Sequence, residues 1–142
     1  HCISSAASDV YKRQTLLNMV KSKDYAVSIH GAKGDKPVIY LGGLDTPLKE
    51  AIKKQLVKHH FVVKIAPTYL GGDLKENFIN EDIKGKGVQL ELTTALRKSL
   101  FVNEKLSAKS RNNRSNWSPA MYRFSDAIDK AVQQVDESGK DR

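Results

Sequence analysis

PVIYL at residues 37–41 opens the part of the sequence that decides the fold, which continues with TPLKEAIKKQLVKH at 46–59 and FVVKIA at 61–66. The two outer stretches are short, apolar and rich in β-branched residues, which is typical of buried strands. The middle stretch has apolar residues at helical spacing, with Thr46 as the expected N-cap and Pro47 in the first turn. The order strand, helix, strand predicts one parallel βαβ unit.

A further strand is predicted downstream, in GKGVQLELTTALR at residues 85–97. Its apolar and polar residues alternate with the period of a strand, and Glu91 places one carboxylate inside that pattern. Glu91 could lie on a solvent face or pair with a cation such as Arg97. It could also serve chemistry, because burial raises the pKa of a carboxylic acid towards the range of a general base. Spacing alone leaves these alternatives open.

The rest of the chain supplies flanking elements. We expect a short helix over 15–23, a strand over 26–29 that ends at His30, and a long loop over 67–86. A basic irregular segment follows at 103–117, and a helix begins at Ser118 and Pro119. The expected core face of that helix consists of Phe124, Ile128, Ala131 and Val135. The predicted fold class is α/β, with a mixed, mainly parallel sheet flanked by helices.

Composition limits the class of protein. The 142 residues suit one domain, the net charge of +8 favours an anionic partner, and the single cysteine excludes an internal disulfide framework. No apolar run has the length of a membrane span, and no secretory signal pattern is visible. Residues 1–14 resemble translated adapter sequence, so we expect a foreign leader there, an incomplete α/β domain over 15–136 and a frayed tail over 137–142.

Several other side chains are candidates for a site. His30 follows a strand, where ligands and metals gather in open α/β sheets, although a lone histidine is more often structural. Asn77 and Asn80, in the long loop, could bind a substrate carboxylate or carbonyl, or could simply form turns. Arg97 could clamp a carboxylate through its forked guanidinium group or could be a surface cation.

A cluster of cations near Trp117 raises nucleic-acid binding as the rival function. A solvated charged face accounts for the cluster better, because no nucleic-acid-binding signature appears. The cluster consists of Arg97, Lys98, Lys105, Lys109, Arg111 and Arg114.

The segments 25–31 (YAVSIHG), 42–44 (GGL) and 85–97, taken in order, resemble the poly-γ-glutamate hydrolase family, and the prophage-type branch most closely. The resemblance covers nearly everything from about Thr15 to Lys140. It implies a zinc-carboxypeptidase-like fold, hydrolysis of γ-glutamyl amide bonds in the polymer, and a cytoplasmic or phage-associated protein. It implies no membrane partner, and a nucleic acid partner is not expected.

The resemblance also assigns roles to individual residues. His30 matches the later histidine ligand of zinc, Glu91 the expected general base, and Arg97 a residue that helps to bind substrate carboxylates. The family's first two zinc ligands come from an earlier strand of the pattern His-Gly-Gly-Gly-Ile-Glu, which is absent here, and Asn80 is followed by Glu81 where many members have arginine. We therefore expect the chain to be amino-terminally truncated, to bind zinc weakly and to be inactive by itself.

Overall fold

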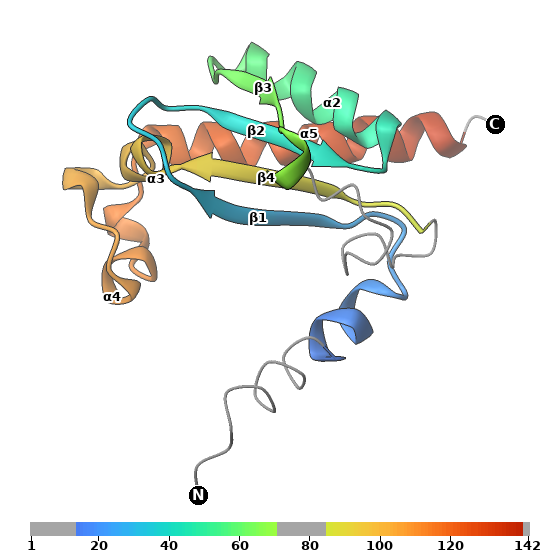
Figure 1. The fold of residues 1–142 in the computed structure, drawn as a ribbon, viewed down its shortest axis with the longest axis horizontal. Coiled ribbons are helices and arrows are strands. Elements are labelled where there is room, and N and C mark those ends of the chain that lie inside the picture. Colours follow the sequence, from blue (N-terminus) through green and yellow to red (C-terminus); the bar gives the residue numbers. More distant parts are fainter. Residues whose placement is uncertain (1–13, 71–84, 141–142) are drawn as a thin grey trace, which may run out of the picture.

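The strand–helix–strand unit is present, with β2 at Ile39–Gly43, α2 at Thr46–Lys58 and β3 at Val63–Ile65. β2 and β3 are parallel neighbours, so the βαβ prediction is confirmed. The structure is a computed structural model that describes residues 14–70 and 85–140 (Figure 1).

Four strands form one sheet in the order β1-β4-β2-β3. β1 (Val27–Ala32) is parallel to β4 (Val88–Thr93), whereas β4 is antiparallel to β2. The last strand of the sequence therefore lies between the first two. Two of the three pairings are parallel, which confirms the mixed, mainly parallel α/β class.

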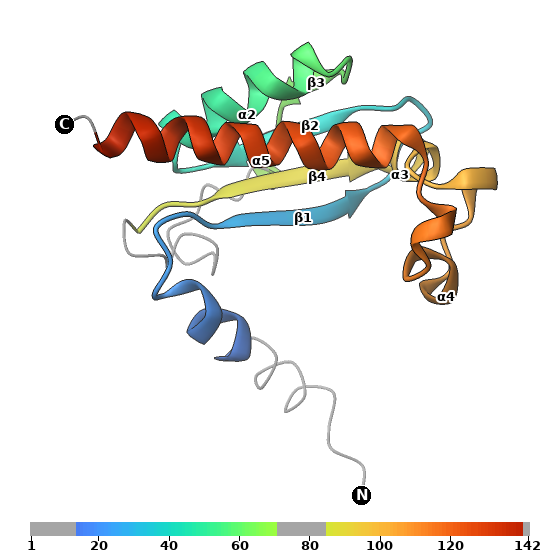
Figure 2. The same ribbon diagram turned by 180° about the vertical axis from the view of Figure 1, so that it is seen from behind.

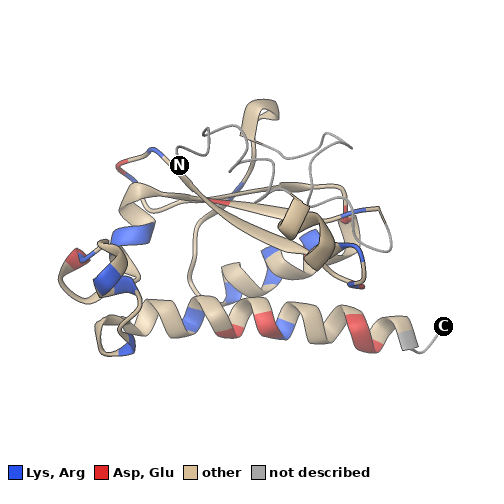
Figure 3. Ribbon diagram, turned by 90° about the horizontal axis from the view of Figure 1, so that it is seen from below, with Lys and Arg blue, Asp and Glu red and all other residues tan. Residues whose placement is uncertain are grey.

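Two long helices cover one face of this sheet and pack against each other (Figures 2 and 3). α5 (Pro119–Lys140) runs across β4 and β2 with α2 beside it. The four expected apolar positions of α5 all belong to or pack against the core, as predicted. The largest fully buried side chains come from β2, β4 and α2, and they are Ile39, Leu41, Leu48, Ile52, Leu56, Val88 and Leu90.

The remaining described elements are short. A helix covers residues 14–20, close to the predicted 15–23. The others are η1 (Thr68–Leu70), α3 (Thr94–Ser99), η3 (Val102–Glu104), α4 (Ala108–Arg111) and η4 (Arg114–Asn116). Within the described residues, we find no helix with the length and apolar character that crossing a membrane requires.

Four details differ from the sequence-based expectations. Asp45, not Thr46, is the N-cap of α2, because its carboxylate accepts a hydrogen bond from the Leu48 amide at 3.0 Å. β3 is an edge strand with Lys64 and Ile65 exposed, so it is not buried as predicted. β1 continues through His30 to Ala32 because β4 pairs with it that far. α5 remains helical to Lys140, beyond the expected start of fraying.

The turn after β2 depends on glycine at position 43. Gly43 has φ of 102°, in the left-handed region that side chains disfavour. A Cβ added there would also collide with the carbonyl oxygen of Gly87. This close approach lets the residues before β4 run beside the end of β2, which sets the register of the sheet's centre.

Candidate functional site

The two faces of β4 carry different chemistry. Val88, Leu90 and Leu92 point towards the helices, and the alternation of a strand directs Gln89, Glu91 and Thr93 to the other face. All six residues are buried, and Glu91 is only 7% exposed. The prediction of an alternating strand is confirmed, and the alternative that Glu91 lies on a solvent face is wrong.

A row of four polar side chains crosses this second face, one from each strand. His30 of β1 lies opposite Glu91 of β4, Glu91 lies opposite Tyr40 of β2, and Tyr40 lies opposite Lys64 of β3. Paired residues on adjacent strands share a face and lie about 5 Å apart. We call His30, Glu91, Tyr40 and Lys64 the polar row. It brings together two of the predicted site residues, His30 and Glu91.

Burial varies along the polar row. Glu91 is buried, Tyr40 is half-buried, and His30 and Lys64 at the two edge strands are exposed. Among the described residues, His30, Tyr40 and Lys64 have no side-chain hydrogen bond or ion pair, so these three groups are available to a ligand. The row is therefore a buried carboxylate with accessible groups on either side.

Gln89 orients the carboxylate of Glu91. Its amide nitrogen donates to Glu91 Oε1 at 3.1 Å and to the carbonyl oxygen of Leu70 at 3.1 Å. The second bond places η1 over this face of the sheet. The carboxylate is thus held by an amide and is paired with no cation among the described residues.

Ser28 adds a second polar group beside the row. It lies on β1 two residues before His30, opposite Gln89, and it is 9% exposed. Its hydroxyl oxygen is buried and has no hydrogen-bond partner. Buried hydroxyl groups are nearly always hydrogen-bonded in folded proteins, so an unpaired one beside a buried carboxylate marks a place for a water molecule or ligand.

Thr93 fixes the end of β4 immediately after this site. Its hydroxyl accepts from the amides of Val38 and Leu96 at 3.0 and 3.3 Å and donates to the carbonyl oxygen of Lys36 at 2.7 Å. It is also the N-cap of α3. A single side chain thus joins the strand that carries Glu91 to the loop before β2 and to the following helix.

Arg97 does not join the polar row. Its guanidinium group lies where a Cβ on Gly31 would point, 3.0 Å from that position, and Gly31 alternates with His30 along β1. Arg97 Nη2 donates to the Ala32 carbonyl oxygen at 3.4 Å and to Thr94 Oγ1 at 3.2 Å. The guanidinium group and Glu91 are on opposite faces of the sheet, so the alternative that they form an ion pair is wrong.

Two predicted contacts lie outside the described residues, namely Asn77 and Asn80. Within 14–70 and 85–140, no three histidine, cysteine or acidic side chains are grouped closely enough to hold a metal. His30, an exposed imidazole beside a buried carboxylate, suits zinc as one ligand. A catalytic zinc site usually has three protein ligands, so the described residues provide an incomplete set.

The basic cluster lies at the end of the molecule that carries α3 and α4 (Figure 3). Its aromatic residue is already engaged, because the Arg114 guanidinium group lies 5.4 Å from the Trp117 ring centre and Tyr122 packs at 6.0 Å. Trp117 Nε1 also donates to the Arg111 carbonyl oxygen at 2.9 Å. Trp117 is thus held by contacts within the chain, and the nucleic-acid alternative remains a prediction.

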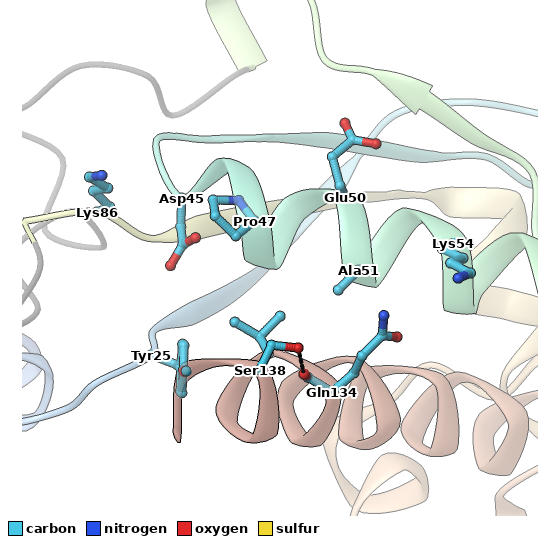
Figure 4. A pocket seen from close by; sticks show the side chains of 11 residues that line it. Tyr25, Asp45, Pro47, Glu50, Ala51, Lys54, Lys86, Gln134 and Ser138 are labelled. Atoms are coloured by element: carbon cyan, nitrogen blue, oxygen red, sulfur yellow. Dashed lines mark hydrogen bonds between the residues drawn. The ribbon is translucent and has the colours of Figure 1, made fainter. Parts of the chain in front are cut away.

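A cleft of about 610 Å³ opens elsewhere, between the start of α2 and the end of α5 (Figure 4). Asp45, Glu50 and Lys54 line it on the α2 side, and Gln134 and Ser138 line it on the α5 side. These helices cover the apolar face of the sheet, so the cleft and the polar row are on different sides of it. The chemistry of the polar row does not involve this cleft.

Tyr40, Lys64 and Ser28 were missed by the sequence-based selection of site residues. Their signal was present in the alternation of PVIYL, FVVKIA and AVSI, since one face of each strand had to be opposite the helices. Recognising it required the register between strands, which the sequence alone does not provide.

Comparison with known proteins identifies the family of this chain. The sequence profile of the family described as poly-gamma-glutamate hydrolase matches residues 4–127. The match begins inside the segment expected to be a foreign leader, and that expectation remains a prediction. The solved structure of a bacteriophage poly-gamma-glutamate hydrolase superimposes with a TM-score of 0.78 at 30% identity, covering 85% of this chain and 57% of that one.

Further relatives agree with this match. A zinc-free apo form of YNDL has a TM-score of 0.76 at 24% identity, over 85% of this chain and 59% of its own, and supports the fold. In Bacillus subtilis (strain 168), UPF0714 protein YmaC is 30% identical over 84 residues, which are 58% of this chain and 36% of YmaC. The SPbeta prophage-derived UPF0714 protein YoqZ of the same strain is 28% identical over 87 residues, 60% of this chain and 32% of YoqZ. The chain thus spans about a third of these two relatives.

Proposed function

The chain belongs to the poly-γ-glutamate hydrolase family, and from this we propose that it carries part of a site for hydrolysing γ-glutamyl amide bonds in poly-γ-glutamate. The observation that carries the proposal is the buried carboxylate of Glu91 directly opposite the exposed imidazole of His30. A carboxylate in this position can accept a proton from a water molecule and return it to the leaving nitrogen.

The described residues would have the following roles in hydrolysis. Glu91 is the general base, oriented by the Gln89 amide, and His30 is the imidazole opposite it that would hold zinc. When bound, zinc supplies a Lewis acid for the amide carbonyl. The net charge of +8 favours the approach of a polyanion such as poly-γ-glutamate.

Arg97 has a different place in this proposal from its expected one. Its guanidinium group lies behind the sheet, near the end of β1, where it supports the backbone at Ala32. From this position, Arg97 can bind a substrate carboxylate only if the substrate extends past that end of β1. Asn77 and Asn80 remain proposed substrate contacts.

Zinc is the proposed cofactor, and we expect it to be held weakly, because the described residues include no group of three histidine, cysteine or acidic side chains that could hold a metal. We therefore expect little turnover by the chain alone. The first measurement is the zinc content of the purified chain, beside the same measurement on His30→Ala. About one zinc per chain, lost in the variant, would mean that further ligands lie outside the described residues.

The activity itself is tested by incubating the chain with poly-γ-glutamate and following polymer length, with and without added zinc and a chelator. Any cleavage should stop with the chelator and in Glu91→Gln, which keeps the shape but not the basic carboxylate. Cleavage that survives Glu91→Gln would remove Glu91 from the mechanism. A chain that neither binds nor cleaves the polymer, but binds single-stranded nucleic acid with steep salt dependence, would favour the rival basic module.

A further inference from the structure

The polar row continues past Glu91 in the direction away from His30. Tyr40 lies opposite Glu91 on β2, and Lys64 lies opposite Tyr40 on the edge strand β3. Val63, next to Lys64, packs against the apolar core, so Lys64 faces the polar side. The sheet therefore presents a phenol and then an ammonium group in line with the carboxylate.

The side chains of Tyr40 and Lys64 are both available to bind a ligand. Lys64 is exposed and Tyr40 is half-buried, and neither has a side-chain hydrogen bond or ion pair within the part of the chain that the structure describes. Lysine on an edge strand also protects it from pairing with other chains, so exposure by itself assigns no role. The alignment with Glu91 and Tyr40 is what distinguishes Lys64 from the other surface lysines.

Resting on the proposed function, we propose that Tyr40 and Lys64 form a subsite for an α-carboxylate of the γ-linked chain, one to two residues from the bond that is cut. The spacing fits. Two strand separations put Lys64 about 10 Å from Glu91. A γ-glutamyl repeat has more backbone bonds than an α-peptide unit and extends about 6 Å when scaled from it.

The chemistry also fits, because each residue of this polymer carries one free α-carboxylate. The Lys64 ammonium group supplies charge, and the Tyr40 hydroxyl donates a hydrogen bond of the charge-assisted kind. An α-linked polyglutamate also spans about 10 Å, in three residues, but each of its carboxylates ends a flexible side chain, whose ordering costs more than that of a carboxylate attached directly to the backbone. The subsite would thus select the γ-linkage as well as the charge.

The test is the affinity of the full chain for a γ-linked glutamate hexamer, measured by calorimetry, so that no turnover is needed. We expect Lys64→Gln to weaken binding by about threefold to tenfold and Lys64→Arg to restore most of it. Tyr40→Phe should weaken binding by less. The matched control is Lys58→Gln, which removes the same charge from an exposed lysine at the end of α2, on the helix side of the sheet. Circular dichroism of each variant confirms that it is folded.

Equal losses in Lys64→Gln and Lys58→Gln would overturn the subsite, because they would show diffuse attraction of a polyanion. The same holds if an α-linked hexamer loses as much affinity in Lys64→Gln as the γ-linked one. Failure of the unmodified chain to bind the γ-linked hexamer would be a different result, since it would overturn the proposed function and the subsite with it.

Discussion

The two faces of β4 are equally buried, yet they differ in what their side chains do. Towards the helices, Leu90 fills a close-packed apolar layer in which each side chain is held by many weak contacts. On the other face, Glu91 is held by one amide and stands beside groups that lack protein partners. Burial alone therefore does not identify a structural residue. The two faces differ because the apolar side chains are fully packed, whereas the polar face includes groups that have no hydrogen-bond partner among the described residues.

The largest expected effect is on the apolar face. Leu90→Ala should lower the free energy of unfolding by about 2–5 kcal/mol, because Leu90 is fully buried and the sheet cannot collapse into the space it leaves. Urea denaturation of the full chain measures this. Leu16→Ala, at a side chain that is 41% exposed, is the control and should change little. A small loss for Leu90→Ala would mean that the apolar layer is loosely packed.

Thr93→Val should come next, with a loss of about 2 kcal/mol in unfolding free energy. Valine keeps the shape but leaves the buried amide of Val38 without its acceptor and removes the N-cap of α3. The same denaturation experiment measures the loss, and Thr68→Val, at an exposed threonine, serves as the control. Equal stability of the two variants would contradict the role given to the Thr93 hydroxyl.

Glu91→Gln should change the free energy of unfolding by less than about 1 kcal/mol. This small effect is expected although Glu91 is adjacent to Leu90 and is itself buried. The Gln89 amide can still donate to the remaining carbonyl oxygen at position 91. Comparing the urea midpoints of Glu91→Gln and Leu90→Ala sharpens the contrast between the faces. A loss as large as that of Leu90→Ala would make Glu91 a structural residue.

The smallest effect is expected at Asp126, where α5 meets the end of α2. A hydrogen bond from Lys130 Nζ at 2.8 Å, and the nearby ring of His59, lower the pKa of Asp126 below its ordinary value. A lowered folded-state pKa means that the contribution to stability is complete above the unfolded-state value and disappears as pH falls through the folded one. Asp126→Asn should therefore reduce the loss of stability at pH values below about 4.

Urea midpoints of the chain and of Asp126→Asn, measured from neutral to acid pH, check this. Because Asp126 is solvent-exposed, the two curves should differ only slightly. The difference should be present at neutral pH and close as pH falls through the folded-state pKa of Asp126, so a difference that grows towards acid pH would contradict the sign of the linkage.

Most of the fold could be predicted from local patterns. The alternation in residues 88–93, the apolar spacing in 46–59 and the proline that begins α5 each depend on near neighbours, and each prediction was confirmed. The errors came from tertiary context. FVVKIA has the composition of a buried strand, but its place at the edge of the sheet depends on the order of strands, which local composition does not encode.

The candidate site was less accessible to prediction. The sequence identified His30 and Glu91 singly, but their pairing needs the register of two strands that are far apart in the chain. Arg97 shows the opposite case, since it is near Glu91 in sequence but separated from it by the sheet. About one turn of helix after β4 was enough to move that side chain to the other side.

The central place of β4 also has a consequence for how the chain folds. β1 and β2 follow each other in sequence, yet the sheet requires a strand made much later to be inserted between them. A direct hairpin of β1 with β2 would form sooner, because it closes a shorter loop, and would have to open again. We therefore expect slow refolding, in which the hairpin of β1 with β2 forms first and must then separate. In the nascent chain, His30 has no Glu91 beside it until residues 88–93 have been synthesised.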